Sequence, residues 1–456
     1  MLELKEKTDL KNKYFSQLLY IAFPILIEGV VLQLQTLINR AFLGNSNEEY
    51  LSVVGNALFP YYTTNQILIA ASTGLTILVA HNMGAGKQRR AAAFFEASLI
   101  FSTIFSIALF VLWLFFPNYI FSIMGVQEPI MDFCVKYAKI LSIPLLILGI
   151  DVSAQAYLQG IGNTKPIMYA GLIRVVLNIL LDWVLIFGKL GFPQMEIFGA
   201  AAAYTISNII SVSVLILYMT FSKKVKLNVS FINMSSYWIK FKDIIKVGLP
   251  TGVEILAWFM GNLIIIKILN KMDTMAVGIY SLTFEIDCLI FLVYNSLARA
   301  SLTMVGNRIG QDKKNEAKEV VYSSMRYNFI FIIVVFILFI IFSEQILGIF
   351  TNDQNLINRS RFLLIITAVT FFPKSLNVIT TSGIRGFGNT KWTLYTQIFG
   401  TVFIALTAYL SGVVFNLAIL GIYITIFFDE CIRASVNTIF LFKNIFRKDV
   451  KSYARD

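Results

Sequence analysis

The sequence predicts an all-α integral membrane protein with twelve transmembrane helices in two six-helix lobes. One observation is composition: 57% of the 456 residues are hydrophobic and only 14% are charged, whereas soluble proteins are roughly half apolar and about one-quarter charged. Another is that apolar runs of about 20 residues, long enough to cross a bilayer, recur along the whole chain. The third is an internal repeat. An ordinary soluble enzyme is therefore excluded.

The apolar runs give the expected helices in order. Each run is long and carries few charges, which indicates a membrane span rather than a strand or a core helix of a soluble protein. We expect twelve spans, centred near residues 30, 65, 105, 145, 177, 209, 256, 292, 332, 370, 402 and 430.

Short motifs occur twice in the chain, and each second copy follows the first by 226 residues. The pairs are Pro24 and Glu28 with Pro250 and Glu254, VAHNMGAGK at 79–87 with VGNRIGQDK at 305–313, and GIGNTK at 160–165 with GFGNTK at 386–391. Chance similarity would give scattered offsets, so the halves are an internal repeat. Because each half holds six spans, both start on the same side and the repeats are parallel. We expect an N-lobe at residues 1–222, a cytoplasmic linker at 223–241 and a C-lobe at 242–456.

The basic residues indicate how the chain is oriented in the membrane. The formal net charge is +12, and Lys and Arg concentrate at both chain ends, in the segment 223–241 and in the loops that hold the repeated motifs. Short cytoplasmic loops of membrane proteins carry such an excess. The charge therefore marks topology rather than a nucleic-acid surface, and we expect both termini to be cytoplasmic.

Two architectures place twelve spans in two parallel halves, the major facilitator fold and one other, and a local motif distinguishes them. Asn178-x-x-x-Asp182 lies in the fifth span, and Gly188 and the run GAAAAYTISN at 199–208 follow it. These residues closely resemble signatures of the multidrug and toxic compound extrusion family, which the facilitator fold lacks. The repeated motifs also resemble this family, so the resemblance covers nearly the whole chain.

The resemblance implies a two-lobed antiporter of the plasma membrane. Such a protein exports amphipathic, mostly cationic small molecules, including drugs and other xenobiotics, in exchange for sodium ions or protons. We expect no cofactor apart from sodium as a candidate coupling ion, and no obligatory protein or nucleic-acid partner. The alternative is a lipid-linked saccharide flippase of the same superfamily, which would need a cationic cleft for phosphate. The acids within the spans argue against the flippase.

The candidate ion-coupling residues are charged or polar side chains inside the spans, where an unpaired charge costs several kcal/mol. Asn178 lies one helical turn before Asp182 on the same face. A desolvated carboxylate can bind a proton near neutral pH, and with amide oxygens around it can hold sodium. Asp182 and Asn178 are therefore the expected sodium or proton site. An Arg174–Asp182 pair is disfavoured because eight helical residues span about 12 Å.

Asn39 marks a departure from the family pattern. The first-span acid that the resemblance implies, five residues before a glycine, falls on Asn39 before Gly44. We still assign Asn39 to the ion-coupling group, but the N-lobe then has one carboxylate fewer, and a mechanism that protonates a carboxylate pair is in doubt.

The candidate substrate-binding residues are the other charges expected in the spans. They are Glu254, Glu28, Glu285, Asp151 and Lys374. Glu254 matches an acid found in one branch of the family. Lys374 falls where part of the family has an acid, and a lysine there could neutralise Glu254 or Glu285. Glu285 and Asp287 are two residues apart and point to different sides of a helix, so at most one should face a cavity. Asp429 and Arg433 have the spacing of a structural ion pair.

Other classes of function lack the residues that they need. The single His and the absence of paired acids at one depth disfavour a membrane-embedded enzyme. An ATP-driven transporter would need a G-x-x-x-x-G-K-[ST] loop, which the sequence does not contain. Cys134, Cys288 and Cys431 have no paired spacing, so neither a disulfide framework nor a zinc site is expected.

Overall fold

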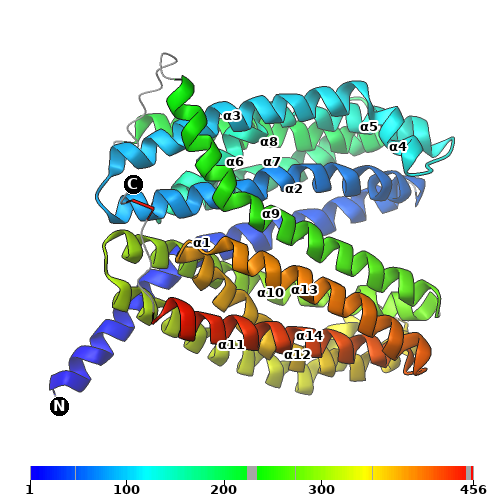
Figure 1. The fold of residues 1–456 in the computed structure, drawn as a ribbon. Coiled ribbons are helices and arrows are strands. Elements are labelled where there is room, and N and C mark those ends of the chain that lie inside the picture. Colours follow the sequence, from blue (N-terminus) through cyan, green and yellow to red (C-terminus); the bar gives the residue numbers. More distant parts are fainter. Residues whose placement is uncertain are drawn as a thin grey trace. The chain divides into compact units, whose positions relative to one another are not determined.

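The structure, a computed structural model, describes residues 2–46, 48–222, 234–272, 274–351, 353–447 and 453–454. All regular elements in these residues are helices (Figure 1). Those of the first half of the chain are α1 (Leu2–Ser46), α2 (Glu48–Gly84), α3 (Gln88–Phe115), α4 (Pro117–Ile123), α5 (Ile130–Ser142), α6 (Leu145–Gly160), α7 (Lys165–Phe187) and α8 (Glu196–Phe221). Those of the second half are α9 (Met234–Asn270), α10 (Thr274–Gly310), α11 (Lys314–Gly348), α12 (Gln354–Gly386), α13 (Thr390–Tyr409), the π-helical turn η2 (Leu410–Val414), α14 (Ala418–Phe440) and the π-helical turn η3 (Leu441–Ile445).

The helices match the expected spans. Within the described residues, ten helices are long and apolar enough to cross a bilayer. The pair α5 and α6 supplies an eleventh crossing, bent by 50° at a break where Pro144 precedes α6. The twelfth expected span is α14, whose 23 residues include Asp429, Glu430 and Arg433. Because α14 carries these three charged residues, its amino-acid composition alone does not identify it as a membrane span.

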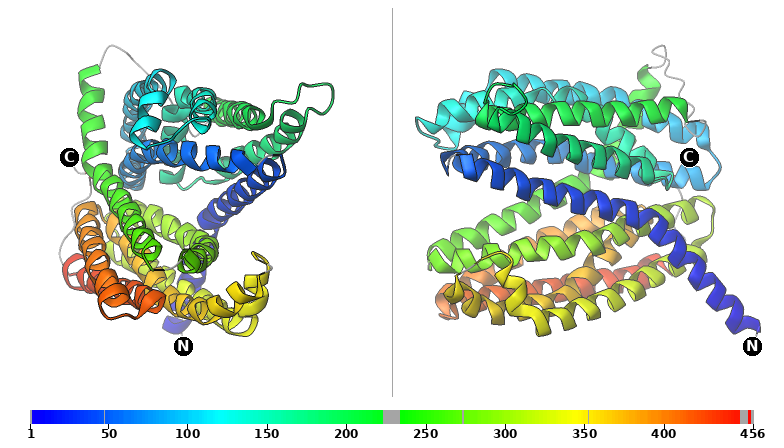
Figure 2. Two further views of the ribbon diagram at one scale, coloured as in Figure 1. Left: turned by 90° about the vertical axis from the view of Figure 1, so that its right-hand side faces the viewer. Right: turned by 180° about the vertical axis from the view of Figure 1, so that it is seen from behind.

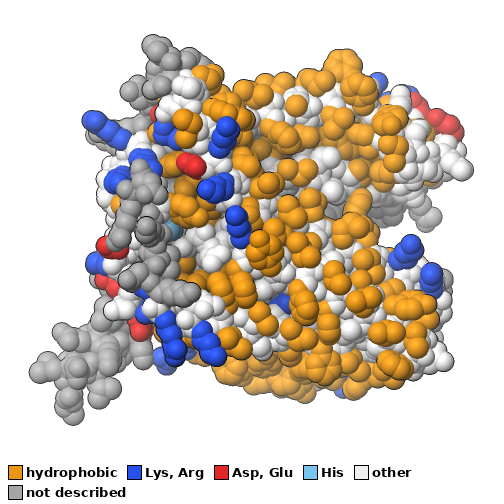
Figure 3. Space-filling view, in the orientation of Figure 1, with side chains coloured by type: hydrophobic (Ala, Val, Ile, Leu, Met, Phe, Trp, Pro, Cys, Tyr) orange, Lys and Arg blue, Asp and Glu red, His pale blue; other side chains and the backbone are white. Residues whose placement is uncertain are grey.

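The surface of the helices is suited to lipid. On the face drawn in Figure 3, hydrophobic side chains cover the middle of the helices, and Lys and Arg gather near one end of them. Large apolar side chains such as Phe115 and Phe399 are 68% and 55% exposed. Contiguous exposed apolar surface of this kind marks contact with a membrane. The all-α integral membrane class is therefore confirmed.

The chain divides into two compact units. One is Phe23–Gly252, and the other is Met1–Ala22 together with Val253–Asp456. The long helices α1 and α9 each pass from one unit into the other, close to Pro24 and Pro250, where proline removes a backbone hydrogen bond. Figure 2 shows both as continuous helices.

This division differs from the expected lobes at 1–222 and 242–456. The first segment of α1 packs with the second half of the chain, and the first segment of α9 packs with the first half. Residues 234–241, expected in the linker, belong to α9, and the rest of that linker, 223–233, lies outside the described residues.

Equivalent aromatic contacts hold the first segments of α1 and α9, each of which packs with the other half of the chain. Phe15 of α1 stacks on Tyr327 of α11 with ring centroids 4.0 Å apart. In the other unit, Phe241 of α9 stacks on Phe101 of α3 at 5.0 Å. Residues 15 and 241 differ by the repeat offset, as do residues 101 and 327, so both contacts follow from the internal repeat.

Glycines allow the tight turns and a close helix contact. Gly162 and Gly388, which the repeat makes equivalent, have φ of 77° and 90° in the turns after α6 and α12, a conformation that favours glycine. A Cβ at Gly199 would lie 2.7 Å from the carbonyl carbon of Leu185, so glycine lets α8 approach α7 closely. This contact fixes α7, which carries Asn178 and Asp182.

Candidate functional site

Four polar side chains meet between α1 and α7 within the unit Phe23–Gly252. Asn178 and Asp182 lie one turn apart on α7 and are fully buried, while Gln35 and Asn39 lie one turn apart on α1. In one orientation of the asparagine amides, Gln35 donates to Asn178 Oδ1 over 2.5 Å, and Asn39 donates to the same oxygen over 3.1 Å. The structure thus brings the three predicted ion-coupling residues together and adds Gln35. The spacing of Gln35 four residues before Asn39 was the signal that could have found it.

The amides of Asn39 and Asn178 can face Asp182 in two ways. With their nitrogens toward it, they donate to Asp182 Oδ2 over 2.6 and 3.1 Å, which suits an ionised carboxylate. With their oxygens toward it, three oxygens converge on one point, and a proton or a cation must lie between them. Asp182 Oδ1 has no hydrogen-bond partner among the described residues. Asp182 can therefore accept a further ligand.

Glu28, a predicted substrate-binding residue, forms an ion pair with an arginine of α7. Arg174 of α7 lies 3.8 Å from Glu28 Oε1, and Glu28 is 93% buried, with 7% of its surface exposed. Gly171 makes room for it, since a Cβ there would lie 2.9 Å from Glu28 Cγ. Arg174 is therefore the ion-pair partner of Glu28 rather than of Asp182. Asp151, also predicted to bind substrate, accepts a hydrogen bond from Gln155 over 2.9 Å.

Glu254, the repeat counterpart of Glu28, is also neutralised by arginine. Arg385 of α12 lies 2.6 Å from Glu254 Oε1, and Thr393 of α13 donates to Oε2 over 2.9 Å. Lys374, which was considered as a partner for Glu254 or Glu285, forms an ion pair with Asp287 of α10. The arginine reaches Glu254 from a different helix, which intrahelical spacing could not reveal.

Because Arg385 already neutralises Glu254, we expect Glu254→Gln to weaken cationic and neutral cargo alike. Its main effect should be on stability, a loss of about 3–5 kcal/mol, since Arg385 is left without its buried partner. Affinities for a matched cationic and neutral pair of cargo molecules, together with thermal unfolding in detergent, check both points. A selective loss of cationic cargo would place Glu254 in the substrate site.

Asp287, rather than its neighbour Glu285, faces a cavity in the unit that contains Val253–Asp456. Asp287 is 8% exposed and lines the cavity. Glu285 is partly buried and is not among the lining residues. Only one of the two therefore lines this cavity, as expected, and it is Asp287 rather than Glu285, the predicted substrate-binding residue.

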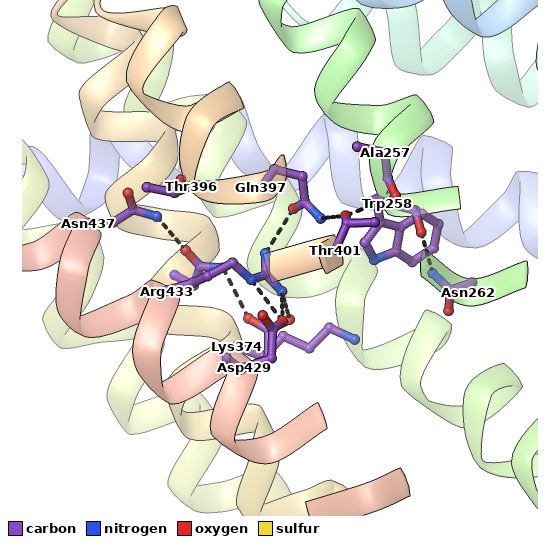
Figure 4. Close-up of polar contacts among 12 residues, drawn as sticks. Ala257, Trp258, Asn262, Lys374, Thr396, Gln397, Thr401, Asp429, Arg433 and Asn437 are labelled. Carbon is purple, nitrogen blue, oxygen red and sulfur yellow. Dashed lines mark hydrogen bonds and ion pairs between the residues drawn. The ribbon is translucent and has the colours of Figure 1, made fainter. Parts of the chain in front are cut away.

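A buried polar network on α14 surrounds Arg433 (Figure 4). Arg433 Nη2 lies 2.7 Å from Asp429 and 2.7 Å from Glu430, and Nη1 donates to Gln397 over 2.9 Å. Glu430 also accepts from Asn377 over 3.0 Å. The predicted Asp429–Arg433 pair is confirmed. Glu430 was missed, although it lies three residues from Arg433 on the same helix.

The cavity has a volume of about 80 Å³ and joins these charged groups to aromatic side chains. Its charged lining residues are Asp287, Lys374, Asp429, Glu430 and Arg433. Its aromatic lining residues are Trp258, Tyr280, Phe284, Phe371 and Tyr423.

No group of three or more His, Cys, Asp or Glu side chains with metal-binding geometry occurs among the described residues. A sodium ion would instead be held by Asp182 with the amide oxygens of Asn178, Asn39 and Gln35. One carboxylate with neutral oxygens suits a monovalent hard cation better than a transition metal.

Parallel repeats, apolar spans and a buried charged centre within each unit define a helical membrane transporter. The MatE family model matches residues 24–184 and again residues 250–410, so both ends of the second match lie 226 residues after the first. The chain belongs to the MatE family. The double match confirms the predicted repeat and the predicted family, and with them the two lobes of six helices. The protein is therefore a transporter and not an enzyme.

Relatives and solved structures agree with this. The chain is 27% identical to the "Probable multidrug resistance protein NorM" of Thermotoga maritima over 441 residues, 95% of this chain and 93% of that protein. It is 24% identical to the "Probable multidrug resistance protein YoeA" of Bacillus subtilis over 382 residues, 82% of each. A MOP superfamily transporter from Pyrococcus furiosus matches with a TM-score of 0.86 and 21% identity, over 95% of this chain and 96% of that one. This likeness shows the fold.

Proposed function

We propose that the protein is a secondary antiporter that exports amphipathic, cationic small molecules in exchange for sodium ions or protons, and so acts in multidrug efflux. It spans the plasma membrane with both termini cytoplasmic and needs no obligatory protein partner. The NorM and YoeA relatives, described as multidrug resistance proteins, support this class of cargo. The concentration of Lys and Arg in one set of connections supports the orientation.

The proposed exchange depends mainly on Asp182. It is a fully buried acid, and among the described residues no Lys or Arg forms an ion pair with it. Glu28, Glu254, Asp287 and Asp429, by contrast, each have a basic partner. An uncompensated charge within a membrane costs several kcal/mol, so binding of a cation or a proton stabilises Asp182.

Exchange requires only that the ion and the cargo prefer different conformations. A cation that enters from outside binds Asp182 with Asn178, Asn39 and Gln35 and favours the inward-facing state. The cargo then binds from the cytoplasm and favours the outward-facing state. Release of the cargo outside lets the next cation bind.

The proposal is tested by efflux of a fluorescent organic cation from proteoliposomes under sodium and pH gradients imposed separately. An inward gradient of the coupling ion should accelerate efflux, and the other gradient should not. Equal efflux with and without either gradient would contradict antiport.

The flippase alternative has less support. Recognition of a lipid-linked phosphate needs cationic side chains that face the cleft without acidic partners. In the described part of the chain, Arg433, which is buried, and Arg174, Lys374 and Arg385, which are mostly buried, each contact an acid.

Restoring a second acid at Asn39 should change the pH dependence. The Asn39 amide lies 2.6 Å from Asp182 Oδ2, and two carboxylates at this distance cannot both ionise cheaply. In Asn39→Asp the pair should retain one proton to higher pH than Asp182 alone. We expect the transition in efflux against pH to move toward neutral or alkaline pH by about one unit or more. Curves that overlay would mean that residues 39 and 182 do not share a site.

A further inference from the structure

A groove between α9 and α13 contains two lysines that form no ion pair with the described residues. Its lining consists of Ile264, Lys267, Ile268 and Lys271 of α9, Ala405 and Tyr409 of α13, and Val413 of η2. All of these residues belong to the unit that contains Val253–Asp456. Lys267 and Lys271 are exposed, and in the described part of the chain no acidic side chain pairs with either. The groove therefore presents positive charge to whatever fills it.

The spacing of the two lysines suits a single anion. Lys267 and Lys271 lie one helical turn apart, so they share one side of α9 and are separated by about 6 Å along the helix axis. A lysine has a flexible four-carbon stem, which lets two such ammonium groups approach one ligand between them. A phosphate group has several charged oxygens that accept strong hydrogen bonds from ammonium groups. The pair is therefore suited to a phosphate.

The internal repeat shows how the groove arises. The positions 226 residues before Ile268 and Val413 are Phe42 and Phe187. In the first copy these two rings pack edge-on with centroids 5.6 Å apart. Smaller aliphatic side chains stand at both positions in the second copy, and the space between them and the lysines is the groove.

The positive charge is also specific to the second copy. The positions 226 residues before Lys267 and Lys271 are Ala41 and Asn45. The second copy thus combines smaller side chains in the wall with two added cations beside them. Space and charge that occur together in one copy indicate a binding site rather than a packing defect.

The other lining residues and their neighbours favour a lipid over a soluble anion. Ile264 and Val413 line the groove beside the lysines, and the nearby Leu263 and Leu406 are 42% and 62% exposed. Acyl chains would cover this apolar surface, whereas a soluble anion would leave it uncovered. Tyr409 adds an amphipathic ring, a type of side chain that is enriched where spans meet lipid headgroups.

We propose that this groove binds the phosphate headgroup of an anionic phospholipid, with Lys267 and Lys271 as its cationic partners and Tyr409 as a hydroxyl donor. Basic pockets between transmembrane helices bind anionic headgroups by the same electrostatics. The groove has a volume of about 230 Å³, which is below the about 300–1,000 Å³ of a pocket for a drug-sized ligand. It suits a headgroup whose acyl chains remain in the bilayer.

The lipid is bound to the protein and is not its cargo, because the two lysines are exposed near the end of a span. The inference does not depend on antiport. The proposed orientation serves only to assign the leaflet: Lys267 lies in the last turn of α9, whose first turns are at the expected cytoplasmic side, so the lipid belongs to the outer leaflet.

The test is a lipid titration of the delipidated full-length protein in detergent, followed by native mass spectrometry. Phosphatidylglycerol, which is anionic, is compared with phosphatidylcholine of the same acyl chains, which is zwitterionic. We expect the first phosphatidylglycerol to bind roughly tenfold more tightly, because two lysines act on its net charge. Equal affinity for the two lipids would overturn the inference.

Paired lysine substitutions locate the site. Lys267→Gln with Lys271→Gln should lower the affinity for phosphatidylglycerol to within about twofold of that for phosphatidylcholine, since the charge is lost. Lys136→Gln with Lys139→Gln is the matched control, because it removes two exposed lysines from α5 of the other unit. The control should retain the preference. An equal loss in both double variants, or a loss in neither, would contradict the assignment.

Filling the groove tests its shape without a change of charge. Ala405→Ile introduces the residue found 226 positions earlier, Ile179, and keeps both lysines. We expect it to weaken phosphatidylglycerol several-fold, because the added side chain occupies the groove. Unchanged affinity would mean that surface charge alone attracts the lipid and that the groove is not its site.

Competition by glycerol 3-phosphate distinguishes a lipid from a soluble anion. At a concentration equal to that of phosphatidylglycerol it should displace little lipid, because it lacks the acyl chains that cover the apolar wall. Complete displacement would replace the lipid assignment by a soluble phosphate. None of these measurements uses an ion gradient, so a failure of gradient-driven efflux leaves the lipid site intact, and a failure of lipid binding leaves the antiport intact.

Discussion

Asp182→Asn should reduce ion-driven efflux from proteoliposomes to the rate of protein-free liposomes. The amide keeps the size and much of the hydrogen bonding of the carboxyl group, but it cannot supply the charge that holds a sodium ion or the site that carries a proton. Asp182 has no ion pair among the described residues, so no buried cation is left uncompensated. The protein should therefore fold and unfold at a temperature close to that of the parent.

Asp132→Asn is the matched control for this substitution. Asp132 also lies in the first half of the chain, and its pair with Lys136 is 56% and 59% exposed, so its loss should have little effect. Gradient-driven efflux by Asp182→Asn near the parental rate would remove Asp182 from the mechanism.

Arg433→Met should cause a large loss of stability. Arg433 alone bonds both Asp429 and Glu430, which are 1% and 5% exposed. Removing it leaves two adjacent buried carboxylates without a cation, and breaking a buried pair in this way costs about 3–5 kcal/mol. The free energy of unfolding in mixed detergent micelles measures the effect.

A charge-neutral triple variant separates this electrostatic cost from lost packing. Asp429→Asn with Glu430→Gln and Arg433→Met removes the acids together with the arginine, so most of the lost stability should return. Arg361→Met, at an exposed pair, should change stability by less than about 1 kcal/mol. A triple variant no more stable than Arg433→Met would mean that side-chain packing, rather than charge, accounts for the stability that Arg433 contributes.

Features that lie on one helix could be predicted from the sequence. The pairs Asn178–Asp182 and Asp429–Arg433 follow from helical spacing, and the structure places each pair together. Gln35 has the same spacing to Asn39 and could have been included. The constant offset of 226 residues likewise predicted which turns are equivalent, and Gly162 and Gly388 share one backbone conformation.

Features that join different helices could not be predicted. Glu254 meets Arg385, and Asp287 meets Lys374, because α9, α10 and α12 pack with particular rotations that one sequence does not disclose. Periodicity placed Asp287 and Glu285 on different sides of α10 but could not tell which side faces the cavity.

The expected lobe boundaries differ from the boundaries of the compact units for a related reason. Lysines around residues 223–242 made this stretch resemble a linker, but Tyr237 donates to Glu96 over 2.9 Å, and Trp238 and Phe241 pack on Phe101. Aromatic packing against α3 makes the first turns of α9 part of a unit. Only tertiary contact reveals this, since lysines recur through the local sequence.

The most direct test of antiport is movement of the ion driven by the cargo. Proteoliposomes are loaded with the organic cation on one side, with no gradient of sodium or pH, and radioactive sodium flux and internal pH are followed together. The account predicts that one of the two ions moves opposite to the cargo and accumulates against its own gradient, and that Asp182→Asn abolishes this movement. Cargo flux with no movement of either ion would contradict the exchange.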